Sequence, residues 1–123
     1  MEKLKILVID DKRIIGDVFD VMVGRKGHEI KYANNYQEAA KFLKATVFDV
    51  AFLDIIIPDK DGISILGDIK KDYPTLPVVM MSGYAVDSKK EQARKLGVVT
   101  ILKKPFDLDD IREAVKLATD KDV

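Results

Sequence analysis

The chain has no cysteine, and this absence excludes several kinds of chemistry. Without thiols there is no disulfide bond, no thiolate zinc site and no cysteine nucleophile. A reducing cytoplasm suits such a composition. Any chemistry must therefore rest on other side chains.

An excess of charge of one sign is also missing. Lysine plus arginine and aspartate plus glutamate number 21 each, and the formal net charge is +0. No overall field draws the molecule to nucleic acid or to an acidic membrane, so we expect no direct nucleic-acid binding. No apolar run approaches the length of a signal core or a membrane span, so we expect no membrane insertion and a cytoplasmic location.

The 123 residues are the right number for one domain with one core. Short apolar runs alternate along the chain with segments of helical periodicity. This alternation, without a linker or low-complexity segment, predicts a single domain over residues 1–123 with an α/β fold. The predicted strands are residues 4–9, 29–33, 49–53, 77–81 and 99–102.

Residues that begin and end helices support this interpretation. The first helix is expected to include Ile14 on its apolar face and to run until Gly27. Asn35, with Glu38 three residues later, resembles a capping box, and Asp107 is placed to cap the last helix. Strands that are apolar throughout, joined by helices, indicate a parallel sheet covered on both faces.

Charged residues follow three of the predicted strands. Asp10 and Asp11 follow the first strand, Asp54 the third, and Lys104 the fifth. In parallel sheets, ligands bind beyond the carboxyl ends of the strands. Two unit charges about 4 Å apart interact by roughly 4 kcal/mol at an effective dielectric near 20. We therefore expect a positive group among the three carboxylates.

Asp54 is the candidate nucleophile. It ends the most apolar strand and precedes three isoleucines, so its carboxylate stands alone in apolar surroundings. Magnesium takes carboxylate oxygens together with a phosphate oxygen, and aspartyl phosphates form when a metal and an amine neutralise the phosphoryl oxygens. The hydroxyl of Ser82, before Gly83, is placed to donate to a phosphoryl oxygen.

Each of these residues also has a plain structural interpretation. Asp10 and Asp11 could form a helix-capping turn, Ser82 an ordinary turn, and Lys104 a solvated surface group. The presence of charged or hydroxyl side chains at the ends of four strands favours a functional site over these separate structural interpretations.

The motifs as a set resemble those of the receiver domains of two-component response regulators, the CheY-like proteins, over essentially the whole chain. The matching residues are the acidic pair Asp10-Asp11, the loop Asp54 to Pro58 with Asp61-Gly62, the hydroxyl residue Ser82, and Lys104-Pro105-Phe106. The resemblance implies a doubly wound, five-stranded parallel sheet of order 2-1-3-4-5.

The resemblance also implies function and site. Asp54 would accept a phosphoryl group from a sensor histidine kinase or a histidine phosphotransfer protein, and the chain would signal to a downstream effector protein or domain. Mg²⁺ would be held by Asp11, Asp54, the Ile56 carbonyl and, through water, Asp10. Lys104 would contact the phosphoryl group, and the chain would catalyse only its own phosphorylation and dephosphorylation.

Two departures from the common family pattern involve three positions. Ile101 stands where many members carry an aromatic ring that moves on phosphorylation. An isoleucine has no ring to move, so it cannot signal the phosphorylated state in that way. Ile56 and Tyr84 are bulky residues two positions beyond Asp54 and Ser82, where the family admits the hydrolytic water. We therefore expect slow self-dephosphorylation.

The sequence leaves other functions open. A Mg²⁺-dependent aspartyl-phosphate phosphohydrolase would carry a second acid where this chain has Ile56, and a nucleotide or flavin module would need a glycine-rich loop after the first strand. A pseudo-receiver used only for binding, or the receiver portion of a larger effector protein, keeps the same fold.

Two further features favour structural interpretations. His28, the only histidine, is expected to be a solvated turn residue, since the sequence shows no partner placed to make it a metal ligand or a phosphodonor. The lysines of residues 89–95 are expected to form a solvated helix face.

Overall fold

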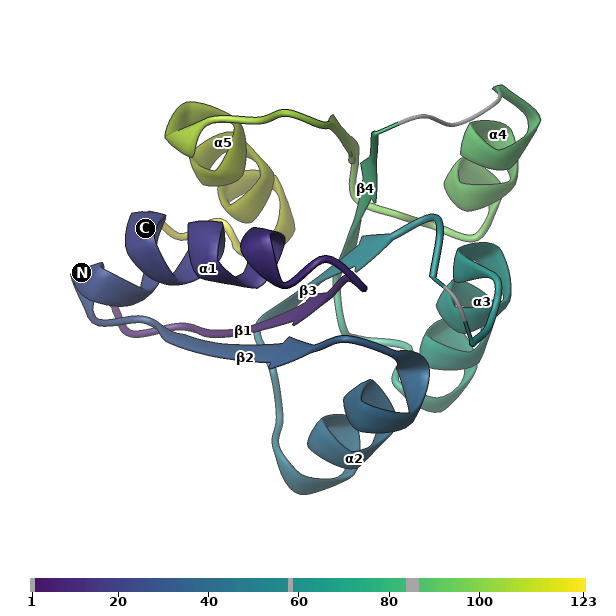
Figure 1. Ribbon diagram of the computed structural model, residues 1–123, viewed down its shortest axis with the longest axis horizontal. Helices are drawn as coiled ribbons and strands as arrows, with labels where there is room; N and C mark the ends of the chain where they lie inside the picture. Colours follow the sequence, from purple (N-terminus) through teal and green to yellow (C-terminus); the bar gives the residue numbers. More distant parts are fainter. Residues whose placement is uncertain (1, 58, 84–86) are drawn as a thin grey trace.

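The computed structural model describes residues 2–57, 59–83 and 87–123 and contains one parallel sheet of order β2-β1-β3-β4-β5 (Figure 1). The expected strand order is confirmed. The strands are β1 (Lys5–Ile9), β2 (Glu29–Ala33), β3 (Val50–Asp54), β4 (Val78–Ser82) and β5 (Ile101–Lys103). Tyr84 lies outside the described residues.

Helices cover both faces of the sheet (Figure 1). Residues of α1 and α5 pack against one face, and residues of α2, α3 and α4 pack against the other. The helices are α1 (Arg13–Met22), the 3-10 turn η1 (Gly24–Lys26), α2 (Tyr36–Ala45), α3 (Gly62–Asp72), α4 (Asp87–Lys95) and α5 (Leu108–Thr119). None of the helices in the described part of the chain has the length and apolarity that crossing a membrane requires.

The alternation of strand side chains divides the core into two layers. On β3, Phe52 packs with Phe19 of α1, and Leu53 packs on the opposite face with residues of α2 and α3. The rings of Phe19 and Phe52 lie 4.7 Å apart between centroids. Both β3 and β4 are buried along their whole length, as parallel strands covered on both faces must be.

The register of the strands brings their carboxyl ends together. Ile9 pairs with Leu53, Asp54 with Met81, and Ser82 with Lys103. Residues just beyond these pairs therefore project from one end of the sheet.

Helix caps agree with the sequence. The Asn35 side chain accepts a hydrogen bond from the Glu38 N–H at 2.8 Å. Asp107 and Asp110 form a reciprocal capping box at the start of α5. These bonds satisfy amide groups that a helix N-terminus leaves without a partner.

The first helix is shorter than expected. The α-helix ends at Met22, and a 3-10 turn follows before Gly27, whose φ of 102° only glycine adopts readily. Ile14 was expected on the apolar face but is 66% exposed, because it lies in the first turn of α1 rather than over the core. The fifth strand is also displaced from the expected 99–102 to Ile101–Lys103, although Val99 already donates a backbone hydrogen bond to Val78.

The expectation for His28 was wrong. Its side chain is buried, and its Nδ1 atom accepts the Leu4 N–H at 3.0 Å. The turn before β2 lies against the start of β1, so a residue far away in sequence supplies a partner that the local sequence did not show. Burial, followed by the charge of Lys26, lowers the pKa of His28 below its ordinary 6.5.

Candidate functional site

Three carboxylates meet at the carboxyl end of the sheet. Asp10 and Asp11 follow β1, Asp54 is the last residue of β3, and one carboxylate oxygen from each lies within 4.8 Å of the others. Asp10 is fully buried and Asp54 is 4% exposed, whereas Asp11 is exposed. The sequence predicted this convergence, and the structure shows it.

The expected positive group is the Lys104 ammonium. Its Nζ atom lies 2.6 Å from Asp10 Oδ2 and 2.9 Å from Asp54 Oδ2. The Lys104 N–H donates to the Ser82 carbonyl at 2.8 Å, which fixes the backbone from which this side chain leaves. Burial would lower the pKa of Lys104, but its hydrogen bonds to the two carboxylates and their charges raise the pKa above 10.5. The ammonium is therefore firmly protonated.

Both the side chain and the backbone of Asp10 form hydrogen bonds. Its Oδ1 atom accepts the Lys12 N–H at 2.9 Å, its own N–H donates to the Ala33 carbonyl at 3.1 Å, and its carbonyl accepts the Tyr32 hydroxyl at 2.7 Å. Burial raises the pKa of Asp10, against the lowering effects of Lys104 and the Lys12 amide, and the charge of Asp54 raises it further. Together these contacts hold a buried carboxylate in one orientation.

Asp54 has a different environment. Its Oδ1 atom accepts the Ile56 N–H at 3.0 Å, while Oδ2 accepts from Lys104. The backbone beyond it is held because Ile55 donates to Met81 and accepts from the Gly62 N–H, each at 3.1 Å. Asp54 lines a cavity of about 220 Å³ with Lys12, Ile56, Gly83 and Lys104. This cavity gives a small reactant access to the carboxylate.

The other residues expected at the site lie nearby. Ser82 ends β4, is 5% exposed and pairs in register with Lys103. Ile56 is 59% exposed at the cavity. Ile101, at the position of the usual aromatic residue, is partly buried and packs against the core.

The donor set fits a hard divalent cation. Three carboxylates without histidine or cysteine favour Mg²⁺, Ca²⁺ or Mn²⁺ over zinc. Asp11 is the exposed member, and among the described residues its carboxylate has one weak ion pair, 3.8 Å from the Lys12 ammonium. An oxygen-rich group of this kind, open at one side, suits an ion that keeps some of its water.

Sequence reasoning missed two residues that shape the site. Tyr32 looked like one residue of a short strand, and nothing local indicated that its hydroxyl reaches Asp10. Gly62 was noted only as part of a motif, although a Cβ there would collide with the Ile55 carbonyl. Tyr32 meets a residue 22 positions away, and the Gly62 contact depends on how the loop that begins at Ile55 folds back.

The α4 lysines were expected to be solvated, and Lys89, whose side chain is 40% exposed, also forms a surface ion pair. Its Nζ atom lies 2.9 Å from Oδ1 of Asp61, the residue that precedes α3. Lys95 remains exposed.

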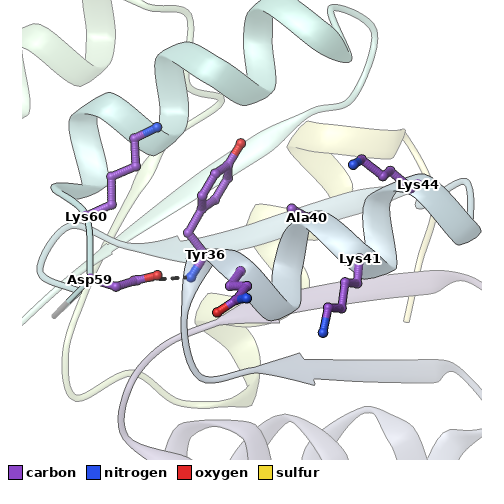
Figure 2. Close-up of a pocket in the computed structure, with 7 residues that line it drawn as sticks. Tyr36, Ala40, Lys41, Lys44, Asp59 and Lys60 are labelled. Atoms are coloured by element: carbon purple, nitrogen blue, oxygen red, sulfur yellow. Dashed lines mark hydrogen bonds between the residues drawn. The ribbon is translucent and has the colours of Figure 1, made fainter.

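A larger hollow, of about 430 Å³, lies elsewhere, between α2 and the segment before α3 (Figure 2). Figure 2 shows the Tyr36 ring between Lys60 and α2, and the Lys60 ammonium lies 4.8 Å from the ring centroid. Its lining includes no member of the acidic cluster. Size alone therefore does not identify the reactive site of this molecule.

Comparisons with known proteins agree with the geometry. Residues 6–116 match the model of the response regulator receiver domain. The response regulator protein PilR of Pseudomonas aeruginosa is 32% identical over 118 residues, which are 96% of this chain and 26% of PilR. Sporulation initiation phosphotransferase F of Bacillus subtilis is 33% identical over 112 residues, covering 91% of this chain and 90% of that protein.

Solved structures show the same fold. A CheY-like response regulator receiver domain protein from Methanospirillum hungatei superposes with a TM-score of 0.90 at 26% identity, covering 97% of this chain and 95% of that one. The chain thus spans nearly all of some relatives and about a quarter of others such as PilR.

Proposed function

This chain belongs to the response regulator receiver domains, and from that membership we propose that Asp54 is its phosphoacceptor and that a histidine kinase or histidine phosphotransfer protein is the donor. The observation that supports this most directly is the bridge of Lys104 between Asp54 and Asp10 beside an open cavity. A carboxylate with an ammonium partner and a free approach has the features that a phosphoryl acceptor needs.

The proposed reaction transfers a phosphoryl group from a histidine nitrogen to Asp54. A carboxylate oxygen of Asp54 attacks the phosphorus of a phosphohistidine, and a P–O bond forms as the P–N bond breaks. The imidazole nitrogen leaves with the bonding electron pair, as a neutral imidazole when its other nitrogen carries a proton. Lys104 stays protonated and stabilises the negative charge on the phosphoryl oxygens.

Mg²⁺ is the proposed cofactor. Asp10, Asp11, Asp54 and the Ile56 carbonyl would hold it, and it supplies positive charge that offsets the phosphoryl oxygens. Ser82, at the end of β4, is placed to donate its hydroxyl to a phosphoryl oxygen. The cavity beside Asp54 is lined by Lys12, whose positive charge favours an anionic reactant.

We further propose that residues 1–123 act as one receiver unit in the cytoplasm and pass the signal on by protein contact. Relatives such as PilR are much longer than this chain, which supports an effector protein or domain as the downstream partner. Ile56 stands where a phosphohydrolase would carry its second acid, so the chain modifies itself and turns over no other substrate.

The test is incubation with Mg²⁺ and acetyl phosphate, followed by intact-mass analysis. One labile phosphoryl group per chain is expected in the wild type, none in Asp54→Asn, and one in the matched surface variant Asp109→Asn, whose side chain is 88% exposed. Continuous release of phosphate would instead favour the phosphohydrolase. No adduct on the wild type would overturn the proposal.

A further inference from the structure

The hydroxyl of Tyr32 donates to the Asp10 carbonyl oxygen at 2.7 Å, and neither the family motifs nor the proposed chemistry accounts for this bond. Tyr32 lies on β2, 22 residues from Asp10, and is partly buried against the core layer of α1. We propose that Tyr32 is a positioning residue that holds Asp10 and Asp11 in the arrangement that binds Mg²⁺. This inference rests on the proposed function.

Hydrogen bonds hold the peptide groups on both sides of Asp10. The N–H of Asp10 donates to the Ala33 carbonyl at 3.1 Å, so the peptide before Asp10 is fixed to the end of β2. The carbonyl of Asp10 belongs to the next peptide, which leads into Asp11, and Tyr32 holds that one. Two neighbouring residues of β2 therefore anchor both peptides of the acidic turn.

The peptide between Asp10 and Asp11 sets the direction in which the Asp11 side chain leaves the backbone. Asp10 is also fixed through its own carboxylate, by the Lys12 N–H and the Lys104 ammonium. The carboxylate of Asp11, within the described part of the chain, has just the weak ion pair with Lys12. The Tyr32 bond is therefore the contact that limits rotation of the peptide on which Asp11 depends. Partners of this kind commonly tune metal affinity.

Gly16 of α1 completes the arrangement. A Cβ built on Gly16 would lie 2.6 Å from Tyr32 Cδ1 and 2.8 Å from Tyr32 Cγ, so the tyrosine ring lies flush against the helix backbone. The absence of a side chain at Gly16 lets the ring lie where its hydroxyl meets Asp10. A glycine inside a helix lowers helix stability, and this contact supplies a reason for its presence.

The experiment measures Mg²⁺ binding to the full chain by isothermal titration calorimetry. Tyr32→Phe removes only the hydroxyl, and we expect the Mg²⁺ dissociation constant to rise roughly tenfold. Tyr73→Phe is the matched control, because it removes a hydroxyl from a partly buried tyrosine at the end of α3. Its dissociation constant should equal that of the wild type.

A second measurement distinguishes a positioning role of Tyr32 from a purely structural one. Thermal unfolding in EDTA reports the stability of the metal-free protein, and a positioning role predicts a larger loss in Mg²⁺ affinity than this stability change explains. A changed melting temperature with an unchanged dissociation constant would reduce Tyr32 to a packing residue and overturn the proposal.

Gly16→Ala gives an independent test, since the added methyl displaces the ring without touching an acidic residue. It should weaken Mg²⁺ binding in the wild type and change it by less than about twofold in the Tyr32→Phe background, as expected for residues that act through one contact. Equal effects in both backgrounds would contradict the mechanism.

Failure of the inference and failure of the proposed function give different results. If the wild type binds Mg²⁺ and accepts phosphate while Tyr32→Phe binds equally well, only the role of Tyr32 is lost. If the wild type does not bind Mg²⁺, both are overturned.

Discussion

The ammonium of Lys104 lies 2.9 Å from Oδ2 of Asp54, although the two residues are 50 positions apart in the sequence. The same nitrogen lies 2.6 Å from Oδ2 of Asp10, 94 positions away. One ammonium thus bridges two buried carboxylates, one just after β1 and the other at the end of β3. The bridge joins the ends of β1 and β3 to the segment that follows β5.

Removing this bridge should destabilise the protein. In Lys104→Met the carboxylates of Asp10 and Asp54 face each other without a cation, and we expect a loss of about 3 kcal/mol in the free energy of unfolding. Urea unfolding in EDTA measures it. Lys103→Met, on the neighbouring exposed side chain, is the control and should change stability little. A loss of less than about 1 kcal/mol for Lys104→Met would contradict the role of the bridge.

Gly62 is expected to tolerate no side chain. A Cβ there would clash with the Ile55 carbonyl, to which the Gly62 N–H donates, so Gly62→Ala must displace the backbone beyond Asp54. We expect a loss of at least about 2 kcal/mol in stability and slower phosphorylation.

Gly67→Ala is the matched control on the same helix, where an added Cβ meets nothing within 4 Å. Alanine favours the helix over glycine by about 0.5 to 1 kcal/mol, so this variant should be slightly more stable than the wild type. Equal effects of the two substitutions on the denaturation midpoint would refute the packing argument.

The stability of the protein should depend on the protonation of His28. Its pKa is lowered in the folded state, first by burial and then by Lys26, so the folded protein binds the proton less well than the unfolded chain does. The contribution of neutral His28 is therefore present above the ordinary pKa of 6.5 and is lost as the pH falls through the lower folded value.

Chemical denaturation of the wild type and of His28→Gln over that range of pH measures this effect. The wild type should lose stability more steeply than the variant as the pH falls below 6.5. Parallel curves would show that His28 does not carry the dependence.

The phosphorylated form should be long-lived. Ile56 is 59% exposed at the cavity beside Asp54, and its apolar side chain cannot orient a water molecule toward the phosphoryl group. Ile56→Asn offers a polar side chain at this place and should shorten the lifetime severalfold. The decay of the phosphorylated protein after removal of acetyl phosphate measures it.

Leu117→Asn is the control for Ile56→Asn, since Leu117 is an apolar α5 residue of nearly equal exposure, 60%. Its lifetime should match that of the wild type. Equal lifetimes for all three proteins would remove Ile56 as a cause of slow hydrolysis.

Local pattern was enough for most of the fold. Residues 50–53 are apolar without interruption before Asp54, and Asn35 and Asp107 begin helices by bonds that span only three residues. Periodicity and capping act over short distances, so the sequence expresses them directly. The placement of Asp10, Asp11, Asp54 and Lys104 at one end of the sheet also followed, because parallel strands end together.

Other features depended on contacts between distant segments. Ile14 had the spacing of a core residue but is exposed in the first turn of α1, and His28 looked solvated but accepts a hydrogen bond from the Leu4 N–H. Nothing near Tyr32 in the sequence indicates that its hydroxyl reaches Asp10. The sequence by itself determined the order of the strands and helices and the charged residues at the strand ends. The tertiary structure alone decided which side chains are buried and which form hydrogen bonds near those ends. The reason is that burial and hydrogen bonding across the fold depend on packing between residues far apart in the chain, which no local pattern records.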